Sequence, residues 1–351
     1  MLLSLVGYIL LAKGETKMKK LFTLFLSVLL CFTTCFMFAC KEEAPSGDSG
    51  TVSIRYFADG AEMMPLLKQG QLEIGVLPEP AASTLVSTTP NKTFYRVSIQ
   101  DLYDNTKKAY PQAVIMVKES LLATYPSLAT NLQNAFNANL TWTKENIGSA
   151  VSKISSAFLD GSATTLKAPM LSSEIIDRCG IFYQSAQDGK QEVKDYIDDI
   201  RAIESQSAKA VNDDFFYDGT ATGTFSKQNI TVVAPDGAPA LAIAGFINDN
   251  QNFGTDKEMN YTIVPAANIG SYMVTGNGDI VVLPLNAATK LYEQNGYKLV
   301  SVVTHGNLYL MSSKPIINLA GQTVGVIGQG AVPDLTFKCI LKNNNFSYKV
   351  A

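Results

Sequence analysis

The sequence predicts an α/β protein in which two doubly wound lobes follow an N-terminal export segment. Three observations predict this class: an apolar stretch near the N-terminus, an internal repeat of strand–helix pieces, and helical stretches of about 10–15 residues between short apolar β runs. The chain has 351 residues, which suggests two domains. Each domain would be large enough to bury a core without metal ions or cross-links.

Composition and charge argue for a folded protein that does not bind nucleic acid. The chain is 46% hydrophobic and 17% charged, as in ordinary globular proteins. It has 28 Lys+Arg against 31 Asp+Glu, so it lacks the basic surplus that neutralises phosphates. We therefore expect neither DNA nor RNA as a partner.

The N-terminal segment has the features of a secretory signal. Lys19 and Lys20 precede an uncharged apolar run of 19 residues that ends at Ala39. The pair Ala39-Cys40 resembles the lipobox of bacterial lipoproteins, which implies lipidation of Cys40 and anchoring at the outer face of the cell membrane. Phe38 stands where that motif has a small residue, so a plain transmembrane anchor is the alternative.

Few residues are available for metal or redox chemistry. His305 is the only histidine, so a multi-histidine metal site is impossible and a catalytic triad could be built only around this residue. After residue 40 the chain has only Cys179 and Cys339, which we expect to be free and buried, with a disulfide as the alternative. The string GVIGQG at 325–330 resembles a dinucleotide-binding turn but lacks its third glycine. We expect no metal and no cofactor.

An internal repeat links the start of the globular part to its later part. The string GQLEIGVLPEPAASTL at 70–85 aligns without gaps with GNGDIVVLPLNAATKL at 276–291, at an offset of 206, and eight of sixteen positions are identical. Each copy reads as a buried strand, a Leu-Pro pair and a helix start. A second pair, at 229–246 and 322–341, reads as a strand, a Gly-Ala turn and a helix that begins near a proline.

The two copies carry these pieces in different orders. In the central part of the chain the strand–turn–helix piece comes before the Leu-Pro piece, whereas in the other copy it lies at the C-terminal end. A circular permutation accounts for this, because joining Ala351 to the segment that begins at Thr51 would restore the common order. The original ends would then lie near Asp218 and Thr220, in a loop-like stretch.

These patterns divide the globular part into two lobes, which we call the split lobe and the central lobe. Residues 118–205 of the central lobe have apolar residues at helical spacing and read as a helical coat. The expected ranges are 1–40 for the signal, 41–50 for a linker, 51–110 plus 316–351 for the split lobe, 111–218 plus 229–315 for the central lobe, and 219–228 for a second linker.

In the un-permuted order the globular chain resembles the substrate-binding proteins of ABC transporters, in the branch that binds nitrate, sulfonates and thiamine precursors. The strings LPEPA, GQGAVPDLTF and APDGAPALAI carry the resemblance, which covers about 290 residues. It implies a periplasmic-binding-protein type II fold, with a ligand cleft between two lobes joined by crossing strands at 112–120 and 307–315. It also implies that the protein is not an enzyme but a monomer that delivers a small-molecule solute to a membrane permease.

Turns that follow buried strands supply the candidate ligand site. Backbone N–H groups at such turns point into the crevice at the strand ends, where an anionic or amide-bearing ligand would bind. Glycines there permit close approach of the backbone, and polar side chains would select the solute, although ordinary turn chemistry and helix-dipole charges are the alternatives. The candidate residues are Asp59, Gly60, Ala61, Glu79, Asp236, Gly237, Ala238, Asn286, Tyr309, Gly328, Gln329, Gly330 and Ala331.

An enzyme on the same scaffold is the alternative function. Some enzymes of pyrimidine synthesis and of the menaquinone pathway share this fold, and here His305 would be the catalytic residue. Export argues against this alternative, because those pathways are cytoplasmic. We expect His305 to lie at the crevice edge or to cap a strand.

Overall fold

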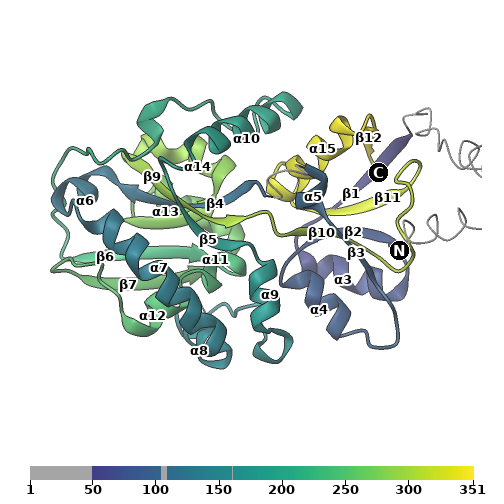
Figure 1. Ribbon diagram of the computed structural model, residues 1–351, viewed down its shortest axis with the longest axis horizontal. Coiled ribbons are helices and arrows are strands. Elements are labelled where there is room, and N and C mark those ends of the chain that lie inside the picture. Colours follow the sequence, from purple (N-terminus) through teal and green to yellow (C-terminus); the bar gives the residue numbers. More distant parts are fainter. Residues whose placement is uncertain (1–49, 104–108, 160) are drawn as a thin grey trace, which may run out of the picture. The chain divides into compact units, whose positions relative to one another are not determined.

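The computed structural model describes residues 50–103, 109–159 and 161–351, which belong to the compact unit Ser49–Ala351. Two six-stranded sheets organise this unit. In Figure 1 the split lobe contains purple and yellow segments, from both ends of the described chain, and the central lobe runs from blue through teal to yellow-green. The expected signal, including Cys40, lies outside the described residues. Among the residues that are described, no helix is long and apolar enough to cross a membrane.

The sheet of the split lobe has the strand order β12-β1-β11-β2-β10-β3. Strands β1, β11 and β2 are parallel neighbours, and their buried aliphatic side chains form much of the core. A helix follows each of these strands, as expected for strand–helix repeats. The elements of this lobe are β1 (Thr51–Phe57), α3 (Gly60–Gln69), β2 (Ile74–Pro78), α4 (Ala81–Ser87), β3 (Tyr95–Ser98), α5 (Ile99–Tyr103), β10 (Leu308–Ser312), β11 (Thr323–Ile327), α15 (Val332–Asn343) and β12 (Ser347–Val350).

The sheet of the central lobe has the order β5-β9-β4-β8-β6-β7. The described part of the expected helical coat contains five α-helices, three of them of ten residues or more, and it also contains the short strand β5. The elements up to α10 are β4 (Pro111–Lys118), α6 (Glu119–Thr124), α7 (Leu128–Glu145), α8 (Ile147–Ser156), η1 (Ala168–Met170), α9 (Ser173–Arg178), β5 (Ile181–Ser185) and α10 (Lys190–Ile203). The elements after it are η2 (Asp213–Phe215), β6 (Asn229–Pro235), α11 (Ala238–Leu241), α12 (Ala244–Asp249), β7 (Glu258–Val264), η3 (Ala266–Asn268), α13 (Ile269–Val274), β8 (Ile280–Pro284), α14 (Leu285–Leu291), η4 (Tyr292–Gln294) and β9 (Tyr297–His305).

The two sheets share one arrangement over five strands. In the central lobe β6 lies parallel between β7 and β8, β4 is antiparallel to β8, and β9 is antiparallel to β4. In the split lobe β11 lies parallel between β1 and β2, β10 is antiparallel to β2, and β3 is antiparallel to β10. Strands β2 and β8 therefore occupy equivalent places, as the repeat at an offset of 206 predicts.

The chain passes from one sheet to the other at two places, between α5 and β4 and again between β9 and β10. The expected crossing stretches, 112–120 and 307–315, each contain the strand that follows a passage. Strand β10 pairs with β2 and β3, so it belongs to the split lobe and not to the central lobe, where the expected boundary at residue 315 places it. The boundary was misplaced because an apolar strand carries no sign in its sequence of which sheet it joins.

The two passages lie directly against each other. Gly306 donates its backbone N–H to the carbonyl of Tyr110 at 2.9 Å, and His305 is paired with Pro111. A Cβ atom on Gly306 would lie 2.3 Å from Cγ of Gln100 and 2.7 Å from Cε1 of Tyr110, so only glycine permits this approach. Gly306 and Tyr110 therefore pack closely where the described parts of the two passages meet.

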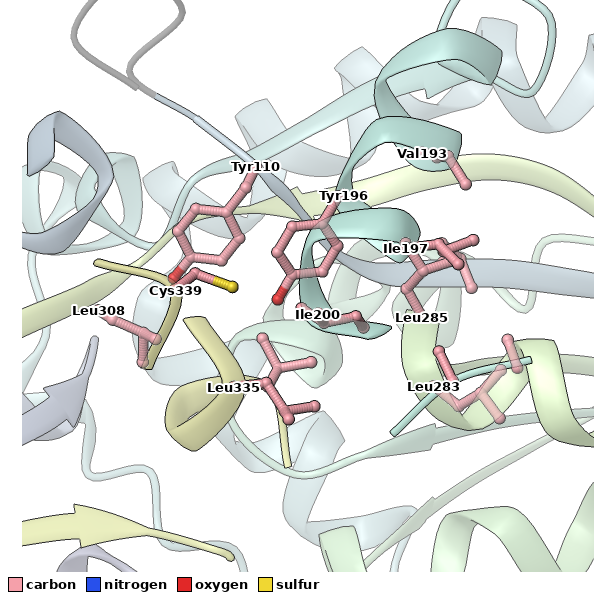
Figure 2. Close-up of a cluster of buried hydrophobic side chains, with 14 of the residues drawn as sticks. Tyr110, Val193, Tyr196, Ile197, Ile200, Leu283, Leu285, Leu308, Leu335 and Cys339 are labelled. Carbon is pink, nitrogen blue, oxygen red and sulfur yellow. The ribbon is translucent and has the colours of Figure 1, made fainter. Parts of the chain in front are cut away.

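One apolar core continues across the boundary between the lobes. Helix α10 of the central lobe packs against α15 of the split lobe, and Oη of Tyr196 lies 2.8 Å from Oγ1 of Thr336. The rings of Tyr110 and Tyr196 stack with their centroids 5.5 Å apart. Figure 2 shows these two rings beside Leu335 and Cys339 in the same cluster. The lobes therefore meet through well-packed apolar side chains on this side.

Both cysteines of the described residues, Cys179 and Cys339, are buried and free.

The last strand of the chain pairs with the first described strand. Strand β12 is parallel to β1, and Ala351 donates its N–H to the carbonyl of Ile54 at 2.8 Å. At about 3.3 Å per residue, Ala351 lies about 14 Å from Thr51. This separation is within the reach of a short linker, as the permutation hypothesis requires, and the permutation itself stays a prediction.

Candidate functional site

A buried carboxylate gathers side chains from both lobes. Glu79, directly after β2, is 1% exposed. Its Oε1 accepts hydrogen bonds from Oγ of Ser83 at 2.8 Å and from Nε of Arg178 at 3.0 Å, and Nη1 of Arg96 lies 2.9 Å away. Its Oε2 accepts from the backbone N–H of Ser83 at 3.0 Å. Two guanidinium groups and one serine therefore compensate for the burial of this charge.

Short elements of both lobes position these groups. The apolar strand β2 ends at the boundary, so Glu79 lies beside the first turn of α4, which supplies Ser83. Arg96 comes from β3 of the same lobe, whereas Arg178 is the last residue of α9 in the central lobe. Ser172 caps α9 by accepting a hydrogen bond from the N–H of Ile175 at 3.2 Å. The contact between Arg178 and Glu79 thus joins the two lobes.

The electrostatics of the cluster keep the Arg178 guanidinium charged and Tyr309 neutral. Desolvation lowers the pKa of Arg178, but the hydrogen bond to Glu79 and the charge of that carboxylate outweigh it, so the pKa lies above its usual value. Burial, followed by the charge of Glu79, raises the pKa of Tyr309. The guanidinium of Arg96 lies over the Tyr309 ring, 5.2 Å from the centroid, in a cation–π contact.

Polar atoms without partners gather where the chain passes between the lobes. Among the described residues, the buried side-chain atoms that lack a hydrogen-bond partner include Oη of Tyr110, Oε1 of Gln112, Nδ1 of His305 and Oδ1 of Asn307. Asn307 adjoins the carboxylate cluster, since its carbonyl accepts from the N–H of Glu79 at 2.9 Å. Leaving such an atom unpaired costs about 1–3 kcal/mol. A polar molecule that binds here, or a rearrangement that pairs these atoms, would therefore recover this free energy.

His305 is a buried, neutral residue of the crossing. It is 2% exposed, and its ring stacks on Phe182 with centroids 3.5 Å apart. Its Nε2 lies 3.1 Å from Oε1 of Gln184, which assigns the proton to Nε2 because a carbonyl oxygen only accepts. Desolvation lowers the pKa of His305 to about 3, although a backbone hydrogen bond with Gly180 opposes the shift. His305 is the last residue of β9, and its expected place at a crevice edge or as a strand cap stays a prediction.

The structure brings two of the predicted site residues together across the boundary. Nδ2 of Asn286, in the first turn of α14, donates to the carbonyl of Gly330 at 3.2 Å. Gly330 in turn donates its N–H to Oδ2 of Asp334 at 2.8 Å, and Gly328 donates to the carbonyl of Phe57 at 2.9 Å. Gln329 is exposed between these glycines, and Ala331 is the N-cap of α15.

The predicted turn at Asp236, Gly237 and Ala238 is engaged within its own lobe. Asp236 accepts hydrogen bonds from Oγ1 of Thr164 at 2.6 Å and from both N and Oγ1 of Thr165 at 2.7 Å. These bonds hold the loop that leads to η1. Gly237 has a φ of 95°, which favours glycine, and Ala238 is buried. The carboxylate of Asp236 therefore supports the loop, and a role in ligand binding stays a prediction.

The predicted turn at Asp59, Gly60 and Ala61 caps a helix. Oδ1 of Asp59 accepts from the N–H of Glu62 at 2.9 Å, and Glu62 accepts from the N–H of Ala58 at 2.8 Å. Asp59 is therefore the N-cap of α3, and Glu62 binds the backbone of the residue before the cap. Asp59 and Ala61 are exposed. Their part in binding also stays a prediction.

Sequence reasoning missed the cationic half of the site. Arg96, Arg178 and Ser83 lie outside the strand-end turns that the repeat identifies, and Asn307 was noted only within a crossing strand. One signal was available: the chain has only four arginines, Arg55, Arg96, Arg178 and Arg201. A buried Glu after an apolar strand requires cationic partners, so these few residues were the first to consider.

Two further features of the described residues lie apart from this cluster. No group of three or more His, Cys, Asp or Glu side chains there could hold a metal ion. A cavity of about 220 Å³ is lined by residues of α5, α10 and the start of β4. Its lining residues are Tyr103, Ala109, Tyr110, Pro111, Glu192, Asp195, Tyr196 and Asp199. None of them is among the residues predicted to bind a solute.

Comparison with known proteins leaves the fold to be argued from this chain itself. No family model and no curated protein matches the sequence. Among solved structures, the chain is similar to the oligopeptide-binding protein AppA from Bacillus subtilis in complex with a nonapeptide. The two are 12% identical with a TM-score of 0.30, and the match covers 75% of this chain and 58% of that chain. The two-lobe description therefore rests on the strand orders and hydrogen bonds given above.

Proposed function

We propose that this chain is an extracytoplasmic solute-binding protein, which captures a small polar molecule between the split lobe and the central lobe and delivers it to an ABC permease. The observation that carries the proposal is that the two lobes have matching sheets and that polar residues near their strand ends contact each other across the boundary. Arg178 reaches Glu79 from the opposite lobe at 3.0 Å, and Asn286 reaches Gly330 at 3.2 Å. Such contacts can be exchanged for contacts with a solute when the lobes open and close.

The enzyme alternative has less physical support. A general acid or base must reach its substrate and titrate near the working pH. His305 is 2% exposed and stacked on Phe182, and burial lowers its pKa to about 3. A neutral, enclosed imidazole of this kind is suited to packing at the crossing, not to proton transfer.

A ligand screen tests the proposal. Residues 49–351, which form one compact unit, are heated with thiamine-type pyrimidines, nitrate, alkanesulfonates and riboflavin. A bound solute at 100 times its Kd adds about 2.7 kcal/mol of stability, which raises the melting temperature. A folded protein that responds to none of these solutes, and to no member of a broader metabolite library, would contradict the proposal.

The proposed anchor requires a separate experiment. Cys40 would carry lipid, and the protein would act as a monomer at the outer face of the cell membrane. Cells expressing the full chain are labelled with radioactive palmitate, and the Cys40→Ser variant is the control. Label in the unmodified protein alone supports the anchor, whereas equal label in both, or none in either, argues for a plain signal or a transmembrane anchor.

A further inference from the structure

The arginines of this chain are unusually concentrated. Only four occur in 351 residues, and two of them, Arg96 and Arg178, contact the same carboxylate. All other basic residues apart from His305 are lysines. A guanidinium differs from an ammonium in presenting a planar fork of donors that fits the two oxygens of a carboxylate or sulfonate. Two of the four arginines, Arg96 and Arg178, therefore lie where a planar set of donors can bind a carboxylate.

Both guanidinium groups converge on one point. Besides Glu79, each contacts the hydroxyl of Ser83: Nη2 of Arg96 donates at 3.0 Å and Nη2 of Arg178 at 3.1 Å. The contacts of Arg96 with Glu79 and Ser83 use two of its five N–H groups. The two arginine side chains are 24% and 26% exposed, so a solute in the boundary region can reach them although Glu79 is enclosed.

The two arginines belong to different lobes, which has a consequence for opening. Arg96 and Glu79 both lie in the split lobe and stay together when the lobes separate, whereas Arg178 leaves with the central lobe. An oxyanion that enters the open boundary then meets Arg96, and closure brings Arg178 to it. Glu79 occupies the position of that oxyanion in the structure, as an internal carboxylate that holds both guanidinium groups.

The neighbouring groups complete a small polar site. The Tyr309 ring lies beneath the Arg96 guanidinium and supplies an apolar wall, with 5.2 Å between guanidinium carbon and ring centroid. Asn307 is 2% exposed, and its unpartnered Oδ1 is an acceptor beside the Glu79 backbone. It would accept a hydrogen bond from an N–H or O–H group adjacent to the oxyanion.

We propose that Arg96 and Arg178 form the oxyanion-recognition pair of the solute site, and that the solute is a small molecule with a carboxylate or sulfonate group that competes with Glu79. This inference rests on the proposed solute-binding function and names the chemical class of its ligand. It assigns Glu79 as a competitor of the ligand, so the removal of its charge should strengthen binding.

The test uses acids with their neutral amides as matched probes. Propionate with propionamide, glutarate with glutaramide, and ethanesulfonate with ethanesulfonamide are titrated into the purified protein by calorimetry. We expect at least one acid to bind and its amide to bind at least about tenfold more weakly. Arg96→Gln and Arg178→Gln should each weaken binding of that acid by about tenfold or more, and Glu79→Gln should tighten it by about tenfold.

Two control variants separate binding from general stability. Arg55→Gln removes an arginine of the split lobe that lies over the Phe57 ring, away from this cluster. Asp279→Asn changes another fully buried carboxylate, which is held by Lys118 and Lys227 within the central lobe. Both should leave the affinity for the acid unchanged. Arg96→Lys keeps the positive charge but lacks the planar set of donors of the guanidinium. It should therefore weaken binding of the acid if the two oxygens of the ligand are recognised by that planar set.

The outcomes are distinguishable. An amide that binds as tightly as its acid, or a Glu79→Gln variant that weakens binding as Arg96→Gln does, overturns the inference. If Glu79→Gln fails to fold, two measurements still test the inference: the comparison of acid with amide on the unmodified protein, and the affinity of the Arg96→Lys variant. Neutral solutes that bind equally well to Arg96→Gln and Arg178→Gln overturn the inference but leave the proposed function standing. If neither these probes nor the broad screen bind, both fail.

Discussion

Arg178 donates from Nε to Oε1 of Glu79 at 3.0 Å, and this contact joins α9 of the central lobe to the end of β2 in the split lobe. The carboxylate has three further donor contacts inside its own lobe, from Arg96 and from the N–H and hydroxyl of Ser83. The two partners of the inter-lobe contact are therefore unequal. Glu79 keeps most of its partners without Arg178, whereas the cationic groups lose their shared anion without Glu79.

The first prediction follows from this inequality. Arg178→Gln should lower the free energy of unfolding by about 1–2 kcal/mol, because the buried carboxylate stays paired. Glu79→Ala should lower it by about 3–5 kcal/mol, because it leaves the guanidinium of Arg96 without its anion and that of Arg178 with only the exposed Glu174. Urea unfolding with a constant m-value measures both changes. Equal losses in the two variants would mean that the contact between the lobes, and not the carboxylate cluster, supplies the stability.

The second prediction concerns the pH dependence of stability at His305. Burial lowers its pKa in the folded protein to about 3 from its usual value of 6.5. Between these values the unfolded chain binds a proton that the folded chain does not, so stability is full above about pH 6.5 and falls as the pH decreases towards 3. Gln184 connects the ring to Glu192 through hydrogen bonds of 3.1 Å each.

At about 1.4 kcal/mol per pH unit, up to about 3 kcal/mol should be lost between pH 7 and pH 4 through this residue. His305→Gln removes the titrating group, so the difference in unfolding free energy between the variant and the unmodified protein should shrink by that amount over the same interval. Phe182→Leu keeps the histidine and serves as a control for lost stacking. A difference that stays constant with pH would show that His305 titrates normally.

The sequence predicts the fold through the repeat and fails where the repeat has no counterpart. Strands β2 and β8 carry the same Leu-Pro pair and occupy equivalent places in their sheets. Helix α9, which carries Arg178, lies in the stretch between the two copies, and only tertiary packing places it against α4. No local sequence pattern predicts that Arg178 and Glu79, which are 99 positions apart, come into contact.

At the candidate site, too, the sequence predicts some features and misses others. The strand-end turns were identified from Gly and Pro positions, and Asn286 with Gly330 do meet across the boundary at 3.2 Å. Asp59 and Asp236 have the predicted positions at turns, but their carboxylates are engaged by a helix N-terminus and by a loop. The same short polar side chain suits a cap, a loop anchor or a ligand contact, so residue type alone does not separate these roles.

The third prediction tests the role of Asp236 as a loop anchor. Its carboxylate accepts from the Thr165 N–H at 2.7 Å, and this bond is charge-assisted. In Asp236→Asn the charge is lost, so amide hydrogen exchange at Thr165 should become about tenfold faster or more. Asp59→Asn is the matched control, since it should affect the Glu62 amide at the start of α3 and leave Thr165 unchanged. Unaltered exchange at Thr165 would mean that the loop is held by other contacts.

The fourth prediction tests the permutation. A rearranged chain would run from residue 220 to 351, continue through a linker of about five Gly and Ser residues, and then run from 51 to 218. Five residues span up to about 17 Å, which covers the separation of about 14 Å between Ala351 and Thr51. The new ends interrupt only a local turn, in which Thr220 donates to Asp218 from its N–H at 2.9 Å and from its hydroxyl at 2.6 Å.

The rearranged chain should fold to the same structure and unfold within about 1 kcal/mol of residues 49–351, because closing a short loop costs little entropy. Circular dichroism, urea unfolding and the solute titrations described above measure fold, stability and binding on both chains. A control with the same linker but with the cut inside β6, at Val233, should fail to fold, because that strand is buried between β7 and β8. If the rearranged chain also fails, the edge strand β12 and the neighbouring β1 cannot be continuous parts of one ancestral lobe, and the reversed order of the repeats needs another explanation.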